Sequence, residues 1–287
     1  MTDFWILQTL NTLQYAALLF LISAGLSVSF GLMGFVNLAH GALYMLGAYL
    51  GIAIADRAGY WTALAVVPLM IGTIGTILYL GLLRRIERAG PMPQVLVSFG
   101  LIFMVVEIVR ICWGDIPLTL DIPTALAGRI QISGAGYPGY RLFIIMVGGG
   151  LALALQSGIS KTAFGAALRA SVENPEMAQA IGIRTGHLFT TVFALGAALA
   201  GLGGVMSTPI TSASTSMAIS ALIPALIVTV IGGIGSVSGT VLGALIVATV
   251  EVLGASFWPD ASAVLIYAVL ALALIWHPEG LLAARKA

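Results

Sequence analysis

Long apolar stretches separated by short polar segments dominate the hydrophobic pattern of this chain. A helix needs about 20 mostly apolar residues to cross a bilayer, and by that rule the pattern predicts nine spans. They cover residues 12–32, 36–55, 61–83, 94–113, 141–159, 188–208, 218–234, 237–255 and 260–277. Short, glycine-rich connections at 36–55 and around 218–255 leave open that one of these segments is re-entrant or broken. We expect an all-α polytopic membrane protein, a bundle of about 8–10 transmembrane helices.

Composition agrees with this pattern. Of the 287 residues, 60% are hydrophobic and only 8% are charged, with a mean hydropathy of +1.08, whereas a soluble domain carries roughly 25% charged residues. We expect residues 1–287 to form a single transmembrane domain in contact with membrane lipid. The net charge of +1 and the absence of a basic run argue against a nucleic-acid partner. The single cysteine, Cys112, excludes an intramolecular disulfide and any cysteine-based zinc site.

The basic residues between the predicted spans are unevenly distributed, and an excess of Lys and Arg marks cytoplasmic loops. Nine spans with a cytoplasmic C-terminus place the N-terminus outside. The cytoplasmic side then holds Arg84, Arg85, Arg88, Lys161, Arg169, Arg184, Arg285 and Lys286. The outer side holds only Arg57, Arg129 and Arg141. We therefore expect this orientation, with loop 114–140 outside and loop 160–187 inside.

Asn37 and His40 interrupt an apolar and glycine-rich stretch, "FGLMGFVNLAHGALYMLGAYL". A polar side chain without a partner is costly in hydrocarbon, so both should face protein or water. They lie about one helical turn apart and therefore share a face. One interpretation is a hydrogen bond across helices or a cap at the start of the span. The other is that they line the inner part of a pathway or gate, together with Gly41.

The chain has 35 glycines, and several recur four residues apart, including Gly235, Gly239 and Gly243. Such spacing leaves one helix face bare, which favours close helix packing in a membrane. The alternative is that Gly235 and Gly239 thin the wall of a pathway or permit a broken helix. The uncharged, hydroxyl-rich outer segment 207–220, "STPITSASTSMAIS", would suit the lining of a pathway, or it is an ordinary polar loop.

Three charged residues lie well inside predicted spans, beyond the first residue of the span. Glu107 and Arg110 are three residues apart and can pair on one helix face, and such a pair is costly unless it is buried in the bundle. We interpret it as an internal structural pair, with an ion relay as the alternative. Glu251 lies near the outer end of its span, where it reaches the interface or contacts a partner.

The inner loop contains "RASVENPEMAQAIGIRTGH", residues 169–187. Asn174 suits an N-cap, Pro175 the first helical position, and Glu176 the positive end of the helix dipole. A short amphipathic helix is therefore predicted over about 175–181, ending at Gly182. It is too short to be stable alone, so it must pack against the chain's own spans or dock in the groove of a partner.

This loop resembles the cytoplasmic coupling loop of ATP-binding-cassette (ABC) importer permeases, with Glu173, Ala178 and Gly182 matching its acid–alanine–glycine pattern. "GLMGFVNLAHGALYMLGAY", "VIGGIGSVSGTVLGALIV" and "HPEGLL" resemble other parts of one family, and the likeness covers nearly the whole chain in order. The chain thus resembles permease subunits of the high-affinity branched-chain amino acid ABC transporters. That family also includes urea and short-amide permeases.

The resemblance implies a multi-pass permease in the bacterial inner membrane that forms the pathway for branched-chain or related small amino acids. It also implies a second permease subunit (expected to be a different chain), two ABC ATPase subunits and a periplasmic solute-binding protein. The ATPase-coupling loop would comprise Glu173, Asn174, Pro175, Glu176, Met177, Ala178 and Gly182. Pro175 and Glu176 depart from a simple alanine-rich start, which leaves the first residue of the coupling helix open.

We expect no cofactor, no metal and no catalytic residue in this chain. A P-loop needs glycine before Lys-[Ser/Thr], but Ser160 precedes Lys161 and Thr162, so ATP and Mg²⁺ would bind to the partner subunits. The residues also allow comparison with two other function classes. An ion-coupled secondary transporter would depend on Glu107, Arg110 and Glu251, while an intramembrane enzyme lacks a recognisable catalytic motif.

Overall fold

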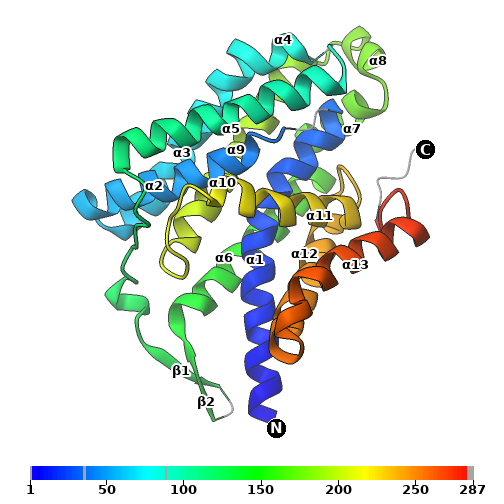
Figure 1. Cartoon of the computed structure of the whole chain (residues 1–287). Helices are drawn as coiled ribbons and strands as arrows, with labels where there is room; N and C mark the ends of the chain where they lie inside the picture. Colours follow the sequence, from blue (N-terminus) through cyan, green and yellow to red (C-terminus); the bar gives the residue numbers. More distant parts are fainter. Residues whose placement is uncertain (1, 35–36, 88, 133, 283–287) are drawn as a thin grey trace.

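The computed structural model describes residues 2–34, 37–87, 89–132 and 134–282, which are predominantly helical (Figure 1). The α-helices are α1 (Thr2–Met33), α2 (His40–Ala58), α3 (Tyr60–Leu78), α4 (Arg84–Ile86), α5 (Pro91–Trp113), α6 (Gly139–Lys161), α7 (Ala163–Glu173), α8 (Pro175–Ala180), α9 (Thr185–Ser207), α10 (Met217–Ser220), α11 (Leu222–Gly232), α12 (Val237–Phe257) and α13 (Ser262–Trp276). The other elements are a π-helical segment η1 (Tyr79–Leu83), the 3-10 turns η2 (Thr124–Leu126) and η3 (Pro259–Ala261), and strands β1 (Arg129–Ile132) and β2 (Ala135–Pro138).

Within the described residues, seven helical segments are long and apolar enough to cross a membrane. They are Asp3–Gly31, Tyr60–Ile86, Pro91–Trp113, Gly139–Lys161, Thr185–Ser207, Val237–Phe257 and Pro259–Trp276. The other two predicted spans are also helical but do not meet this criterion. The 19 residues of α2 include His40, Asp56 and Arg57, and the segment 218–234 is interrupted at Ala221 between α10 and α11. The all-α polytopic class is therefore confirmed, with seven segments meeting the criterion instead of nine.

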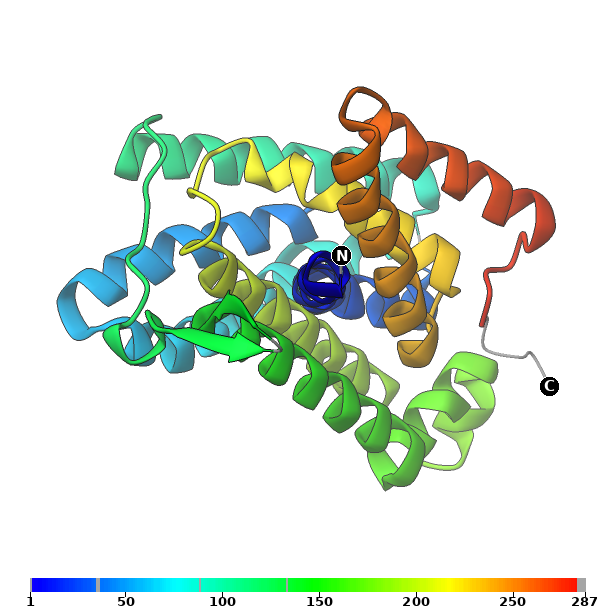
Figure 2. The same ribbon diagram turned by 90° about the horizontal axis from the view of Figure 1, so that it is seen from below.

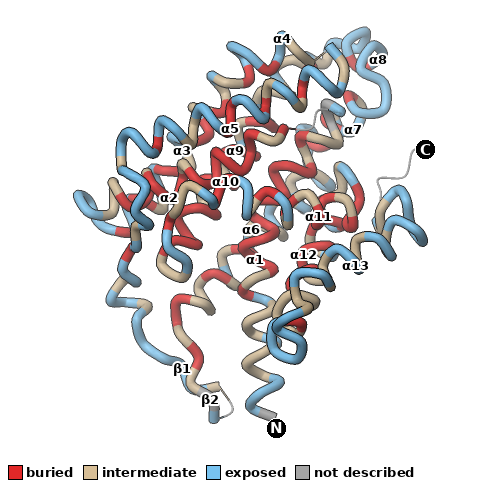
Figure 3. Tube along the Cα trace, in the orientation of Figure 1, coloured by how far each residue is buried: buried red, intermediate tan, exposed pale blue. Residues whose placement is uncertain are grey.

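Helix α1 is the centre of the bundle. Seen along its axis it lies in the middle of the molecule (Figure 2), and it packs against α6, α9, α11 and α12. In an apolar 18-residue stretch of α1, 78% of the residues are buried, whereas in the corresponding stretch of the last span, Pro259–Trp276, 0% are buried. The tube in Figure 3 shows the same gradient, from a buried α1 to an exposed α13. The apolar surface of α13 is therefore available to lipid or to another chain.

Direct glycine contacts let the central helices approach closely. A Cβ atom built on Gly25 of α1 would lie 2.6 Å from the Cα of Gly196 in α9, and one on Gly47 of α2 would lie 2.6 Å from the Cα of Gly201. Real Cβ atoms do not come this close to backbone, so these positions require glycine. This confirms tight packing as the role of many of the glycines, Gly47 among them.

The segments expected on opposite sides of the membrane lie at opposite ends of the molecule. The N-terminal end of α1, the β1–β2 hairpin and the turn between α12 and α13 gather at the lower end in Figure 1, while α4 and α8 lie at the upper end. The antiparallel hairpin pairs Arg129 with Pro138, and it lies in segment 114–140, which was expected to be an outer loop.

The hairpin is tied to α1 through Asn11. The Oδ1 atom of Asn11 accepts hydrogen bonds from the Tyr137 hydroxyl at 3.2 Å and from Arg141 Nη1 at 2.9 Å. Burial raises the pKa of Tyr137, with the positive charge of Arg141 opposing the shift, so this phenol remains protonated and can donate.

Candidate functional site

The predicted coupling segment forms a short capped helix, as its local sequence indicates. The Oδ1 atom of Asn174 accepts a hydrogen bond from the Met177 amide at 2.9 Å, and Pro175 occupies the first turn. At the other end, Gly182 has φ +91°, its amide bonds to the Gln179 carbonyl at 3.0 Å, and the next amide bonds to the Ala178 carbonyl at 2.9 Å. These two bonds form a Schellman motif. The predicted N-cap and the stop at Gly182 are therefore confirmed.

Helix α8 attaches to the rest of the protein through a small buried side chain and leaves larger apolar ones uncovered. Ala178 is buried, while Met177 is 60% exposed and Ile181 is 68% exposed. Glu173 and Glu176 are exposed as well, and Figure 3 shows α8 as a largely exposed segment. Large apolar side chains four residues apart on an exposed loop are typical of a surface that another protein covers.

A cleft of about 700 Å³ separates α8 from the π-helical segment that follows α3. It is lined by Tyr79, Arg84, Glu87, Pro175, Gln179, Ile183, Arg184, Thr185, Gly186 and Phe189. Gln179 crosses from α8 to the start of α9, where its Nε2 atom donates to the Thr185 hydroxyl at 3.0 Å. Helix α8 is thus connected to α7 and α9 and faces open space toward α4.

Of the candidate pathway residues, His40 makes a specific contact between two helices. Its Nε2 atom lies 2.9 Å from the backbone carbonyl oxygen of Ile22 in α1, and the side chain is buried. Asn37 is also buried, but its amide atoms have no hydrogen-bond partner among the described residues. The hydrogen bond across helices is thus confirmed for His40, whereas Asn37 does not share in it.

The three candidate glycines also lie at close helix contacts. A Cβ on Gly41 would lie 2.0 Å from the Ala218 carbonyl oxygen, and one on Gly239 would lie 2.1 Å from that of Gly232. Gly235 has φ +81° and lies against Gly31 of α1. These three glycines, Asn37 and His40 line neither the cleft beside α8 nor the second cavity of the protein, which lies between α1, α2 and segment 207–220. Packing accounts for the glycines, and a pathway role for any of the five stays a prediction.

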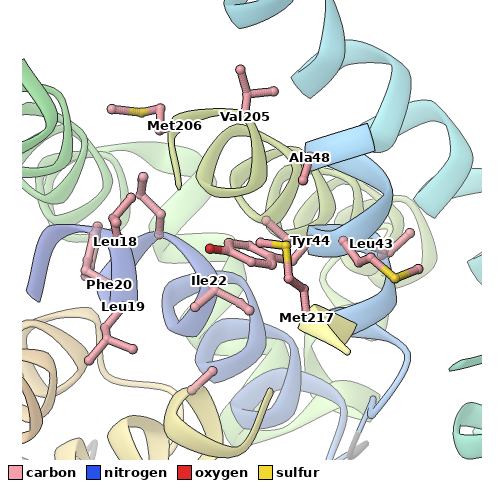
Figure 4. Close-up of a cluster of buried hydrophobic side chains, with 14 of the residues drawn as sticks. Leu18, Leu19, Phe20, Ile22, Leu43, Tyr44, Ala48, Val205, Met206 and Met217 are labelled. Atoms are coloured by element: carbon pink, nitrogen blue, oxygen red, sulfur yellow. The ribbon is translucent and has the colours of Figure 1, made fainter. Parts of the chain in front are cut away.

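A second cavity, of about 370 Å³, lies between α1, α2, the end of α9 and the segment leading through α10 into α11. Its lining consists of Gln14, Tyr15, Leu18, Leu19, Ile22, Tyr44, Ser207, Ile210, Thr211, Ser212, Ser214, Met217, Ser220, Ala221 and Pro224. Figure 4 shows part of this wall, with Tyr44 reaching from α2 toward α1 beside Ile22 and Met217. The hydroxyl-rich segment 207–220 supplies much of the polar lining, and the lining contains no charged residue.

The charged residues within the predicted spans lie in two different environments. Glu107 and Arg110 form an ion pair of 2.9 Å, and Arg110 also lies 3.5 Å from Asp115 near the end of α5. The side chains of the pair are 57% and 46% exposed, so the expectation of a pair inside the bundle was wrong. They remain at the surface because α5 lies at the edge of the bundle and Asp115 draws Arg110 toward the loop.

Glu251 of α12 is the charged residue near the second cavity. Its carboxyl group interacts electrostatically with Tyr15 of the cavity wall, and its Oε2 atom is buried with no hydrogen-bond partner among the described residues. It therefore faces α1, in contrast to the expected position at the interface. The periodicity of the sequence held no signal for this contact, because Tyr15 and Glu251 come from opposite ends of the chain.

No group of three or more His, Cys, Asp or Glu side chains that could hold a metal ion is found in the part of the chain that the structure describes. The arrangement consists instead of a polar cavity, a capped helix at the opposite end from the hairpin, and closely packed helices between them.

Comparison with known proteins gives a consistent result over nearly the full length. A family model described as "Branched-chain amino acid transport system / permease component" matches residues 8–274. The permease protein BraD of the high-affinity branched-chain amino acid transport system of Pseudomonas aeruginosa is 28% identical, over 96% of this chain and 94% of its own.

Two permease proteins of the corresponding system of Escherichia coli K12 are also similar. LivH is 25% identical over 97% of this chain and 96% of its own length. LivM is 24% identical over 91% of this chain and 67% of its own length. No solved structure matches this chain.

Proposed function

This chain belongs to the family of permease components of branched-chain amino acid transport systems, and we propose that it forms part of the pathway of an ABC importer for branched-chain amino acids. Membership in this family makes it a multi-pass transport permease, which the match supports over an ion-coupled secondary transporter. The names of its relatives also favour amino acids over urea or short amides as the cargo.

The proposed coupling role depends on one observation, the exposed apolar face of a helix that is capped at both ends. The side chains of Met177 and Ile181 are largely exposed, while Ala178 is buried against the rest of the protein. ATP-driven closure of an ATPase dimer would push on this face and rock the permease between its two states. The cleft beside α8 gives the helix room to move toward α4.

The proposed pathway includes the cavity lined by segment 207–220. Its hydroxyl groups can replace part of the hydration shell of a small polar cargo through weak, exchangeable hydrogen bonds. A lining without a fixed charge would keep these contacts transient, which suits a permease that receives its cargo from a separate binding protein.

The remaining subunits and the location are part of the same proposal. A second, different permease is supported by the two E. coli permease proteins that resemble this chain. Two ATPase subunits would bind ATP and Mg²⁺ and dock on α8, and a periplasmic binding protein would deliver cargo on the hairpin side. The N-terminus would lie outside a bacterial inner membrane, with α8 and the C-terminus in the cytoplasm.

The first test is purification of the tagged chain in mild detergent from its native membrane, with every co-purifying chain identified by mass spectrometry. We expect a P-loop ATPase and a second apolar permease in stoichiometric amounts. Uptake of labelled leucine, isoleucine and valine into proteoliposomes of this complex then tests the cargo. Recovery of the chain alone, with transport driven by an ion gradient, would refute the importer.

A further inference from the structure

Helix α5 has one face packed on the bundle and one face that the described residues leave uncovered. The packed face faces mainly α2, and its buried residues recur at helical spacing, as Gln94, Ser98, Leu101, Ile102 and Val109. Exposed large apolar side chains recur at the same spacing on the other side, among them Leu96, Phe99, Phe103, Ile108 and Ile111. We call this uncovered side, together with Glu107 and Arg110, the free face of α5. It lies at the edge of the molecule (Figure 2).

The ion pair of Glu107 and Arg110 makes the free face of α5 unsuited to lipid. The two side chains are 57% and 46% exposed, and Glu107 lies about 9 Å along the axis from the end of α5 at Trp113. Arginine near a helix end can extend to the headgroup region, but the shorter side chain of Glu107 reaches less far. Charged side chains inside a span almost always face protein or a water-filled cavity. The pair therefore indicates that another chain covers this face.

The other exposed spans that the structure describes carry no such charge. Helices α3 and α13 contain no charged residue, so lipid can cover them. In α6 the charged residues are Arg141 and Lys161, which lie at the two ends of the helix, and Arg141 also binds Asn11 of α1. Charge thus distinguishes α5 from the exposed helices that lipid can cover.

We propose that the free face of α5 is the contact with the second permease subunit of the importer. This inference rests on the proposed function, because the partner is the different permease chain proposed there. Glu107 lies within a span, so the chain that covers it must itself lie in the membrane, which excludes the ATPase subunits and the binding protein.

The similarity of the two permeases supports the same contact. Two permease proteins similar to this chain are named for one transport system of E. coli K12. Subunits that pair about a two-fold axis contribute the same surface patch from each side. The partner would therefore present its own counterpart of α5.

The chemistry of the free face fits such a contact. Phe99 and Phe103 form an edge-on ring pair with centroids 5.0 Å apart, and aromatic side chains are enriched at the centre of protein interfaces. Arg110 binds Glu107 through Nη1 and lies near Asp115 through Nε. A guanidinium group carries five N–H donors, so Arg110 retains donors for an acceptor of the partner.

Photo-crosslinking in the native membrane tests what covers each exposed span. The photoreactive amino acid p-benzoylphenylalanine would replace Phe103 on the free face or, as the matched control, Tyr267 of α13. Both are aromatic residues within apolar spans, and they are 54% and 53% exposed. After illumination we expect a covalent adduct with the second permease from position 103, identified by mass spectrometry, and adducts with lipid only from position 267.

Truncation of the same two side chains measures the strength of the contact. Phe103→Ala removes an aromatic ring from the centre of the proposed interface and should raise the dissociation constant of the two permeases about tenfold. Tyr267→Ala on α13 should leave it unchanged. Dilution of the fluorescently labelled complex in detergent gives the dissociation constants. The unfolding temperature of the chain purified by itself checks that both variants are folded.

The outcomes separate this interface from the proposed function. Lipid adducts alone at position 103, a permease adduct at position 267, or an unchanged dissociation constant for Phe103→Ala would overturn the assignment to α5. Co-purification of an ATPase and a second permease would still support the importer in each case. An adduct between two copies of this chain would overturn the different chain as the occupant. Recovery of the chain without any second permease would refute the proposed assembly and this inference together.

Discussion

His40 shows how a polar residue within an apolar segment can serve packing. Its bond to the Ile22 carbonyl joins the start of α2 to the middle of α1, and the ring is buried. The local sequence indicated that His40 needed a partner but not which one, because Ile22 lies 18 residues earlier.

Substitution His40→Ala should lower the free energy of unfolding by roughly 1–3 kcal/mol, since it removes a buried hydrogen bond and leaves a void. Leucine uptake per folded complex should stay close to wild type. Thermal unfolding in detergent and initial uptake rates would measure the two effects separately. A loss of uptake without loss of stability would indicate a gate at this residue after all.

The ion pair of Glu107 and Arg110 lies on an uncovered face of α5, and Arg110 also lies 3.5 Å from Asp115, so it keeps an acidic partner when Glu107 is replaced. Glu107→Gln should therefore change neither stability nor uptake by more than the error of the measurement. Uptake into proteoliposomes with and without a proton gradient checks this. A gradient-dependent defect would point to an ion relay through α5.

At the scale of elements, α8 was predictable because every signal that defines it is local. Asn174, Pro175 and Gly182 lie within nine residues and each favours one position of a capped helix. The hairpin β1–β2 was not predictable in the same way, and for the segment around 218–255 the sequence left a broken helix open but did not place the break at Ala221. The hairpin is held by Asn11, far away in the sequence, and the break lies beside the close contact of Gly41 with Ala218 and Leu222.

The exposed apolar face of α8 gives a direct test of coupling. Met177→Asp should leave folding intact, because the side chain is 60% exposed, but a charge there would weaken docking to an ATPase by about 1–3 kcal/mol. Co-purification of the ATPase and transport-coupled ATP hydrolysis should both fall. Thermal unfolding of the permease alone should not change.

The matched control for that variant is Ile116→Asp. Ile116 is 76% exposed and lies in loop 114–140, between α5 and the hairpin, away from α8. The same chemical change there should preserve ATPase binding. Equal ATPase binding by both variants would count against α8 as the docking helix.

At the scale of the whole molecule, the bundle depends on backbone contacts that tolerate no side chain. Gly25→Ala would place a methyl group 2.6 Å from the Gly196 Cα atom, so α1 and α9 must separate or distort. We expect destabilisation by about 1–3 kcal/mol, typical of overpacking, measured as a lower unfolding temperature in detergent.

Gly100→Ala on α5 provides the comparison. A Cβ atom at Gly100 meets no heavy atom within 4 Å, so this substitution should be neutral or slightly stabilising. An equal change of the unfolding temperature by Gly25→Ala and Gly100→Ala would show that α1 and α9 have room for a methyl group at Gly25.

The membrane class and most helices follow from hydrophobic pattern alone, because the bilayer imposes a minimum apolar length on each span. The cavity and the Tyr15–Glu251 pair do not follow from it. They depend on how α1, α2, α10 and α12 meet, and residues from opposite ends of the chain form them. The sequence indicated correctly that segment 207–220 is polar and uncharged, but not which residues it would face.

The glycine contacts at Gly25–Gly196 and Gly47–Gly201 have a mechanical consequence. Where side chains interlock, one helix can move past another only if several rotamers change together, and each change carries a barrier. At these two points bare backbone surfaces meet without such an interlock, so no rotamer there has to change if α9 shifts against α1 or α2. Any resistance to such a shift would come from the neighbouring side chains, such as Leu21 and Tyr44 beside Gly203.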